Sequence, residues 1–419
     1  MRVSTDVTTR PAAERGVALI LVLVLLPLVA ILITQLSFEV VIARQLAHNL
    51  LDNQRFKSAV NARLAQMRLR LVRDLRDDEE GAQQEGAYDY YGDIWGTATG
   101  SVAPVVRKGD RETGDDITLH TEVVDEQSKF NLNLLTHNEA RRAGRAREVL
   151  VNLLDFFRDE RFGDYETNEW DLDPTEAAEV ATGIWNLVRG QERDERIPRP
   201  KVPPPNANMK QGIYTVDDLV FAHELMREKR LLESFNDAES GQVIPSLAEF
   251  VTVYGDGRIN LNTAPIQVLR AMFREPEGQK QVAEDLFHGR GGFLNTEEDA
   301  EAQEEKGEKR REYLEEGDEE GAESLEQVYK SLNDVVQGVE SIRDQAFLRR
   351  NDVDMGRDFS VRSNFFRVIV TARRGSFVYQ RRVVFERHSN GTVTREVEVR
   401  TADLGRIPGE TGEEPEVEE

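Results

Sequence analysis

Val17–Phe38 reads VALILVLVLLPLVAILITQLSF, and this stretch decides the fold because it contains no charged residue. As a helix that rises 1.5 Å per residue, it would be about 33 Å long, enough to cross a hydrocarbon core of about 30 Å. A cleavable secretory signal has a shorter apolar region and a small-x-small cleavage site, and no such site follows Phe38. The stretch therefore predicts a single transmembrane helix, residues 17–38, with Pro27 inside it.

The orientation of this helix in the membrane does not follow from the charges that flank it. The positive-inside rule compares basic residues on the two sides of a span, and here both sides carry them. They are Arg2, Arg10 and Arg15 before the span and Arg44, Arg55 and Lys57 after it.

The helix is expected to continue well beyond the apolar stretch. Between Leu28 and Glu80 there is neither Gly nor Pro, and apolar residues recur at steps of mostly three or four, which indicates an amphipathic helix. The run Asp77–Gly81 is predicted to end it. The apolar positions include Val41, Leu46, Leu50, Phe56, Val60, Leu64, Met67, Leu71 and Leu75.

The junction before the apolar stretch, Arg15-Gly16-Val17-Ala18-Leu19-Ile20, resembles the leader junction of type IV pilin-like proteins. The resemblance implies that residues 1–16 are a leader, which a prepilin peptidase removes after Gly16 to leave Val17 as the mature N-terminus. Most such proteins have Glu at the fifth mature position, where this chain has Leu21. That departure is typical of the GspK family, the minor pseudopilin K of type II secretion systems.

Leu21 has a physical meaning within this resemblance. In a pilus, the glutamate is thought to neutralise the N-terminal amine of the subunit above it, inside the bilayer. An unpaired carboxylate at that depth costs about 2.5–3.5 kcal/mol, so a subunit with nothing above it does better without one. Leu21 therefore favours the tip of a filament, while an ordinary membrane anchor with an apolar residue at this position remains the alternative.

The soluble part contains strand-like sequences at two widely separated places. They are rich in Val, Ile, Phe, Tyr and Thr and are bounded by turn residues, which predicts a pilin-like antiparallel sheet in an α+β fold. Its first part would come from residues 39–128 and its second part from residues 327–405. The predicted strands are Ile117–Val124, Phe365–Ala372, Phe377–Phe385 and Val393–Val399.

Between these strands, residues 129–294 are predicted to form a large inserted helical domain made of two related modules. The sequence Lys129-Phe130-Asn131-Leu132-Asn133 recurs as Arg258-Ile259-Asn260-Leu261-Asn262, and helical sequence follows each copy. Asn side chains favour caps and turns because they bond to nearby backbone groups. A chance match of the two degenerate segments is the alternative.

Further segments resemble the GspK family in the same order along the chain, and the likeness fails over residues 295–326. It implies that the inserted domain is all-α and SAM-like. It also implies a single-pass protein of the bacterial inner membrane with its bulk in the periplasm, which joins minor pseudopilins I and J, other pseudopilins and the inner-membrane secretion platform. The segments are Asp125–Leu134 (with Ser128 in place of a Gly), Trp170–Pro174, Tyr214–Leu219, Pro245–Glu249, Arg258–Pro265 and Ser363–Val368.

The composition excludes several classes of chemistry. The chain has 54 basic and 78 acidic residues, a net charge of −24, and no cysteine, so disulfides and thiolate metal sites are absent and duplex nucleic acid is a poor partner. The acidic residues gather in 295–326 and in the tail 406–419, both expected to be disordered because like charges repel and few apolar residues offset the ordering entropy.

No catalytic motif of the GxSxG, HExxH, Walker A or GxGxxG type occurs, so neither an enzyme nor a resident organic cofactor is expected. The rival function is a membrane-anchored DNA-binding or DNA-uptake protein, because Ile259–Ala264 resembles the opening of helix-hairpin-helix modules. The glycine hairpin that such modules need is missing after this segment.

Calcium is the one metal that the sequence brings into consideration. Asp352, Asp354 and Asp358 place three carboxylates shortly before a predicted strand, and calcium prefers clustered oxygen ligands. Pseudopilins of the resembled family can bind calcium. A solvated acidic loop is the alternative interpretation of these residues.

Overall fold

The structure, a computed structural model, describes residues 12–81, 88–93, 95–96, 100–102, 117–158, 170–190, 213, 215–236, 241–289, 328–374, 377–388 and 394–406. Residues 1–11 of the predicted leader, the acidic segment 295–326 and nearly all of the acidic tail lie outside them. The chain divides into two compact units, Met1–Ala62 and Arg63–Glu419, which are described separately.

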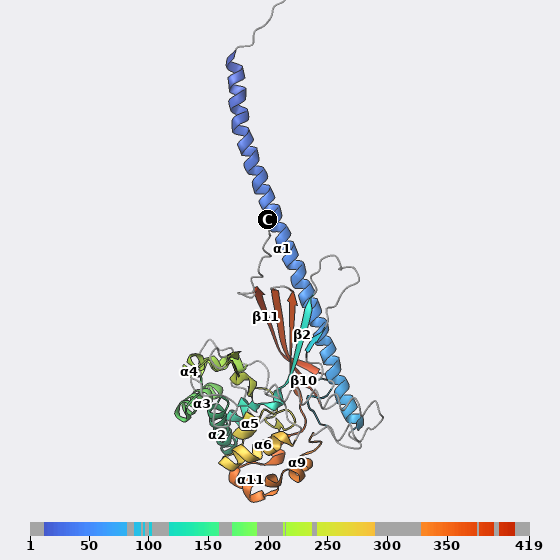
Figure 1. Cartoon of the computed structure of the whole chain (residues 1–419), viewed down its shortest axis with the longest axis vertical. Coiled ribbons are helices and arrows are strands. Elements are labelled where there is room, and N and C mark those ends of the chain that lie inside the picture. The colour runs from blue at the N-terminus through green and yellow to red at the C-terminus, as the bar shows by residue number, and fades with distance from the viewer. Residues whose placement is uncertain are drawn as a thin grey trace, which may run out of the picture. The chain divides into compact units, whose positions relative to one another are not determined.

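The first unit is the N-terminal part of helix α1 (Ala12–Gly81), which contains Pro27 and ends where the sequence predicted. The most apolar 18 residues of this helix have a mean hydropathy of 2.6, and none of them is buried. Of the described residues, this is the one helix long and apolar enough to cross a membrane. It is the blue helix of Figure 1.

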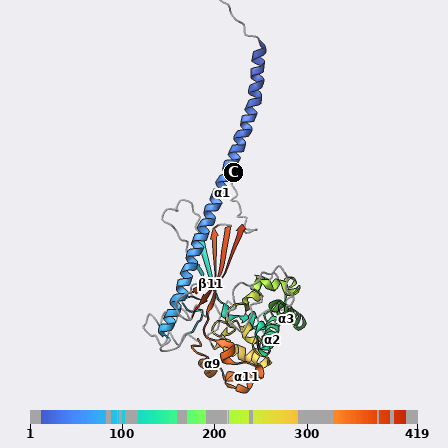
Figure 2. The ribbon, with the colours of Figure 1, turned by 180° about the vertical axis from the view of Figure 1, so that it is seen from behind.

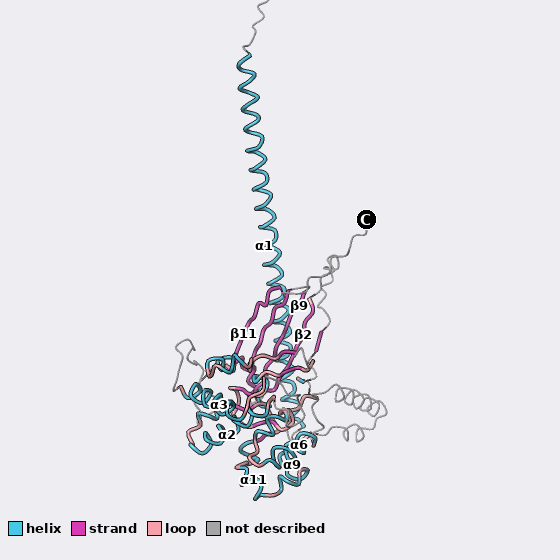
Figure 3. Tube along the Cα trace, turned by 60° about the vertical axis from the view of Figure 1, so that its left-hand side comes forward, coloured by secondary structure: helices cyan, strands magenta, loops and turns pink. Residues whose placement is uncertain are grey.

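The second unit contains a five-stranded antiparallel sheet with the strand order β1-β2-β9-β10-β11. The four predicted strands are confirmed, and the short edge strand β1 was not predicted. Figure 3 shows the sheet in magenta. The strands are β1 (Gly100–Val102), β2 (Thr118–Asp125), β9 (Phe365–Arg374), β10 (Phe377–Arg387) and β11 (Thr394–Arg406).

One face of this sheet is apolar because its strands alternate. In β9 the buried residues Phe366, Val368 and Val370 alternate with half-buried ones, and the register places Val368 between Val123 of β2 and Val383 of β10. The part of α1 that belongs to this unit runs along the sheet in both views of the ribbon (Figures 1 and 2). It buries Leu64, Met67, Leu71 and Leu75, and Arg63 Nε donates to Thr121 Oγ1 of β2 at 2.8 Å.

The helical part follows β2 in the chain, and its apolar side chains form one buried cluster. It is mainly helical, with isolated two-residue strand pairs. Before residue 290 its elements are η2 (Glu126–Ser128), β3 (Phe130–Asn131), η3 (Leu132–Thr136), α2 (Ala140–Phe156), α3 (Pro174–Arg189), η5 (Val216–Phe221), α4 (Leu225–Glu228), β4 (Phe235–Asn236), β5 (Val243–Ile244), η6 (Leu247–Glu249), β6 (Val251–Thr252), β7 (Ile259–Asn260), α5 (Ile266–Ala271), η7 (Gly278–Val282) and α6 (Ala283–His288).

The boundary between the two parts differs from the one expected at residue 327. The segment after that point forms short helices whose Val335, Ile342 and Phe347 belong to the helical core, and the ring of Phe347 lies 5.9 Å from that of Phe273. The sheet resumes only at β9. The added elements are α9 (Leu332–Gly338), α10 (Glu340–Arg343), α11 (Gln345–Asn351), α12 (Met355–Asp358) and β8 (Phe359–Ser360).

The packing of α1 against the sheet gives a stability prediction. Replacing the fully buried Leu71 by Ala should lower the free energy of unfolding by about 2–5 kcal/mol, because it removes apolar contacts and leaves a cavity. The matched control is Leu69→Ala, since Leu69 is 69% exposed on the same helix. Urea unfolding of the full chain in detergent, followed by tryptophan fluorescence, measures both; equal losses would show that the helix does not pack as described.

Candidate functional site

The side chains of the N-terminal helix from Leu21 to Phe38 are almost all apolar, and no polar face alternates with an apolar one. Leu21 is 59% exposed, Leu36 67% and Phe38 66%. Burying apolar surface is worth roughly 25 cal/mol per Å², so a helix of this composition needs a lipid or protein environment to cover it. Gly16 and Val17 lie within α1, in its first two turns.

The first Asn-Leu-Asn segment holds the start of the helical part together. Asn131 pairs through β3 with Thr252 of β6, and its Nδ2 donates to the carbonyl of Tyr254 at 2.7 Å. Its Oδ1 accepts from the backbone N–H of Asn133 at 2.9 Å and so caps η3. Asn133 Nδ2 in turn donates to the carbonyl of Val253 at 2.6 Å.

The second segment repeats this arrangement at another place. Asn260 pairs through β7 with Ser360 of β8, and its Oδ1 accepts from the N–H of Asn262 at 3.0 Å. Asn262 then closes a pair of bonds with Tyr329, donating to its carbonyl at 3.0 Å and accepting from its N–H at 2.9 Å. In both copies the first Asn caps the local turn and the second ties a distant backbone. All four amides are buried, so the repeat stabilises the interior of the helical part through hydrogen bonds.

Asp125, at the end of β2, is the centre of a buried polar network that sequence reasoning did not assign. Its Oδ2 accepts from Thr263 Oγ1 at 2.6 Å, Ser363 Oγ at 2.6 Å and Asn260 Nδ2 at 3.1 Å. Its Oδ1 accepts from the N–H of Gln127 at 2.8 Å. One carboxylate thus joins the sheet, the second Asn segment and the residues that lead into β9.

Burial raises the pKa of Asp125 to about 6, and the nearby Asp89 carboxylate acts in the same direction. The hydrogen bonds from Ser363 and Thr263 act against this shift because they favour the charged form. Asp125 and Ser363 both lie in segments that the sequence analysis quoted, but nothing local to either segment shows that they meet.

Beside Asp125, the fully buried Glu126 is held in its charged form by basic partners. Its carboxylate pairs with Arg367 Nε at 3.0 Å and with Lys129 Nζ at 3.4 Å, and it accepts from Thr252 Oγ1. Burial alone would raise the pKa of Glu126, but Arg367 and Lys129 bring it below its ordinary value. The pKa values of Asp125 and Glu126 are therefore shifted in opposite directions, because only Glu126 has cationic side chains beside it.

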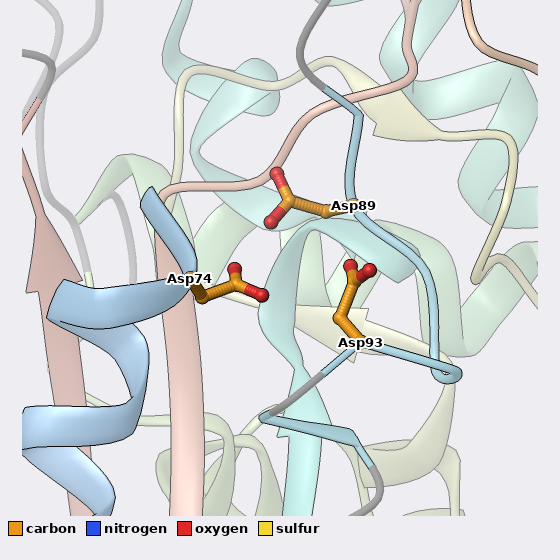
Figure 4. A group of neighbouring side chains, drawn as sticks. All are labelled: Asp74, Asp89 and Asp93. Carbon is orange, nitrogen blue, oxygen red and sulfur yellow. The ribbon is translucent and has the colours of Figure 1, made fainter. Parts of the chain in front are cut away.

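Three more carboxylates, those of Asp74, Asp89 and Asp93, lie within 4.8 Å of one another and could in principle hold a metal ion. Figure 4 shows them turned toward one another, Asp74 from α1 and the other two from the segment after it. Arg387, at the end of β10, already supplies a cation: its Nη1 donates to Asp74 at 2.7 Å and its Nη2 to Asp89. Arg387 is 2% exposed, so a buried guanidinium offsets part of the negative charge of these carboxylates.

The residues predicted to bind calcium are engaged by arginines and by helix ends. Asp352 accepts from Arg141 at 2.6 Å, Asp354 caps α12 by accepting from the N–H of Arg357 at 2.9 Å, and Asp358 pairs with Arg357 at 2.6 Å. Burial works against ionisation of Asp352, but its arginine partners hold its pKa below the ordinary value. Calcium binding here stays a prediction.

The comparisons with known proteins are sparse. No protein-family model matches the chain, and no curated protein is similar to it in sequence. A search of solved structures finds a chain in the crystal structure of the GspK–GspI–GspJ complex from the type 2 secretion system of enterotoxigenic Escherichia coli, at 12% sequence identity and a TM-score of 0.45. The match covers 84% of this chain and 98% of that one. Such a low TM-score establishes neither the fold nor the function, which have to be argued from the chain's own residues.

The raised pKa of Asp125 predicts a pH dependence of stability. The folded pKa of about 6 exceeds the ordinary value of 3.8, so the stabilising contribution of this group is fully present below pH 4 and is lost as the pH rises to 6. The loss is on the order of 3 kcal/mol. In Asp125→Asn this contribution should be absent, since an amide does not titrate and can still accept from Gln127. Unfolding of both proteins between pH 4 and pH 8 measures the difference; parallel curves would contradict the prediction.

Arg387 provides a second prediction. Its replacement by Ala leaves Asp74 and Asp89 buried without their cation and should cost about 3–5 kcal/mol of stability. In that variant the three clustered carboxylates of Asp74, Asp89 and Asp93 lose the Arg387 guanidinium, so millimolar calcium should partly restore the melting temperature. Arg382→Ala, at an exposed position of the same strand, is the control. A calcium effect of equal size in the wild type would mean that Arg387 does not exclude the ion.

Proposed function

We propose that this chain is a minor pseudopilin of a type II secretion system, the K subunit, placed at the tip of the periplasmic pseudopilus where it initiates assembly. The observation that carries the proposal is the N-terminal helix. It combines the leader junction Arg15–Ile20 with an exposed apolar surface and with Leu21 in place of the pilin glutamate. This combination suits a subunit that inserts in the inner membrane, is cut by a prepilin peptidase and then packs against other helices below it.

The second unit supports the tip position by its size. Its antiparallel sheet is joined to a helical part that occupies most of the chain between β2 and β9. In a helical filament, subunits stack along their N-terminal helices, and a bulky head collides with the globular part of any subunit placed above it. Steric bulk and the missing carboxylate are independent features, and both favour a terminal place.

The partners in this proposal are proteins and lipid. Minor pseudopilins I and J and the other pseudopilins would contact the chain, the secretion platform would insert it in the filament, and the bulk of the chain would face the periplasm. The chain would act by contacts, and it would promote secretion of proteins across the outer membrane without breaking a bond in them. The DNA-binding alternative is less favoured because the glycine hairpin that would bind phosphate is missing after Ile259–Ala264 and the chain has a net charge of −24.

Processing tests the first step. The mature protein extracted from membranes should begin at Val17, and Gly16→Phe should leave the leader attached because the peptidase needs a small residue before the cleaved bond. Ala12→Phe, inside the leader, is the matched control and should still be processed. N-terminal sequencing decides: a wild-type protein that begins at Met1, or beyond Phe38, would refute the pilin-type leader.

The tip position is tested by cross-linking. The chain has no cysteine, so Val22→Cys places a unique thiol near the start of the mature helix, where Val22 is 54% exposed. In cells that assemble the pseudopilus, adducts should form with pseudopilins on the lower side alone. Leu21→Glu should change this pattern little, because no subunit above needs the carboxylate. Regular adducts with pseudopilins on both sides would show that the chain lies within the filament body.

A further inference from the structure

Helices α2 and α3 carry on their outer surface a tryptophan with two arginines beside its ring, and none of the roles above uses this group. The guanidinium carbon of Arg189 lies 4.7 Å from the centre of the Trp185 ring, and that of Arg147 lies 5.7 Å from it. Arg147 belongs to α2, and the other two residues belong to α3. Both arginines are exposed and Trp185 is half-buried. These three residues are called the Trp185 cluster below.

The positive charge of the Trp185 cluster is not neutralised by an acid. Arg147 Nη2 donates to Thr182 Oγ1 at 2.9 Å, and Thr182 in turn donates to the carbonyl of Ala178 at 2.7 Å. Of the described residues, none offers a carboxylate to Arg147 or to Arg189. A guanidinium carries several N–H donors, so most donors of both arginines are available to a ligand.

The contact with the indole ring prepares these arginines for a carboxylate ligand. A guanidinium held against an aromatic ring loses less conformational entropy when it binds than a freely moving one. Its planar fork can donate two parallel hydrogen bonds to one carboxylate. Tryptophan and arginine are also enriched among the residues that contribute most to binding in protein interfaces. The Trp185 cluster therefore has the composition and the charge of a docking point for an acidic partner.

An open groove of about 450 Å³ lies beside the cluster on the outer face of α3. Thr182 connects the two features, because it lines the groove and accepts from Arg147. Thr, Asn and His side chains in its lining can donate and accept hydrogen bonds, as the backbone of a bound peptide requires. Glu179 also lines it, so a bound carboxylate belongs on the side of Trp185. The polar lining consists of Thr175, Glu179, Thr182, Asn186 and His223.

We propose that the Trp185 cluster and this groove bind an acidic segment of another protein, with carboxylates on Arg147 and Arg189 and the peptide backbone along the polar lining. A bare phosphate would use the arginines but not the groove. The net charge of −24 opposes a long polyanion such as nucleic acid. The proposal rests on the helical part alone, so it stands or fails independently of whether the chain is a pseudopilin.

The direct test uses the full chain in detergent and a fluorescein-labelled octapeptide of alternating Glu and Ala, followed by fluorescence anisotropy. Micelles without protein supply the background. The peptide should bind, and its counterpart with Gln in place of Glu should bind about tenfold more weakly, because a neutral amide forms weaker hydrogen bonds with a guanidinium. Equal binding of the two peptides, or no rise in anisotropy with either, would overturn the proposal.

Variants of the arginines locate the site. Arg147→Gln should weaken binding about tenfold without changing the melting temperature, since Arg147 is exposed. Arg147→Lys keeps the charge but not the planar fork, so it should bind between the two. Arg382→Gln makes the same charge change at an exposed position of β10 and should leave binding unchanged. Equal weakening by Arg147→Gln and Arg382→Gln would show that the peptide responds to overall charge and not to the cluster.

A variant of the groove tests its part in binding. Ala178 is exposed and lines the groove, so Ala178→Trp fills part of it while both arginines stay in place. This variant should weaken binding of the Glu peptide about tenfold. Ala65→Trp, at an exposed position of α1, is the matched control and should bind as the wild type does. Unchanged binding in Ala178→Trp would contradict the role given to the groove.

Three further measurements separate this partner from other occupants. Sodium phosphate and sodium chloride at equal ionic strength should displace the peptide to the same extent, and displacement by phosphate alone would make this a phosphate site. A labelled oligothymidine that binds as well as the Glu peptide, and loses binding in Arg147→Gln, would make it a nucleic-acid site. Deleting residues 407–419 should leave the peptide affinity unchanged. Tighter binding after that deletion would show that the acidic tail of this chain occupies the site, and would overturn the assignment to another protein.

Discussion

A buried carboxylate needs hydrogen-bond donors around it. In this protein the donors to the Asp125 carboxylate connect the sheet to the helical part. The side chain has no exposed surface, and leaving an ionised group there without partners would cost several kcal/mol. Its partners come from three places far apart in the chain: Gln127, Thr263 and Ser363. Because they can satisfy Asp125 only when all three segments are in place, the network selects one arrangement of β2, β7 and β9.

The same principle explains why so many charges are buried in a chain that is strongly acidic. Arg387 forms ion pairs with Asp74 and Asp89. Arg367 and Lys129 form ion pairs with Glu126. Such pairs give little net stability over apolar residues, but removing one partner is costly. They therefore serve specificity: α1, the sheet and the first turn of the helical part are joined by contacts that tolerate few alternatives.

The elements that follow from a local sequence pattern could be predicted from the sequence. The contacts between residues far apart in the chain could not. The strands of the sheet follow from alternation and turn residues, and the caps at Asn131 and Asn260 follow from the chemistry of the Asn side chain. Arg387 and Asp89 are 298 positions apart, and no sequence periodicity indicates that they form a hydrogen bond. Phe347, in the segment expected to belong to the sheet part, packs against Phe273, and nothing in the local sequence around either residue indicates this contact.

The described chain differs in how well its buried polar groups and its exposed apolar surface are covered. The polar groups of the joint around Asp125 and Arg387 are bound to one another: Ser363 donates to Asp125, and Arg387 donates to Asp74. The apolar surface from Leu21 to Phe38 is in the opposite situation, because the described part of the chain offers nothing that covers it. Because burying apolar surface is favourable, lipid or another protein has to cover these side chains. The proposed function meets this requirement with lipid and neighbouring helices, and the folded second unit would then be the part that such an assembly presents.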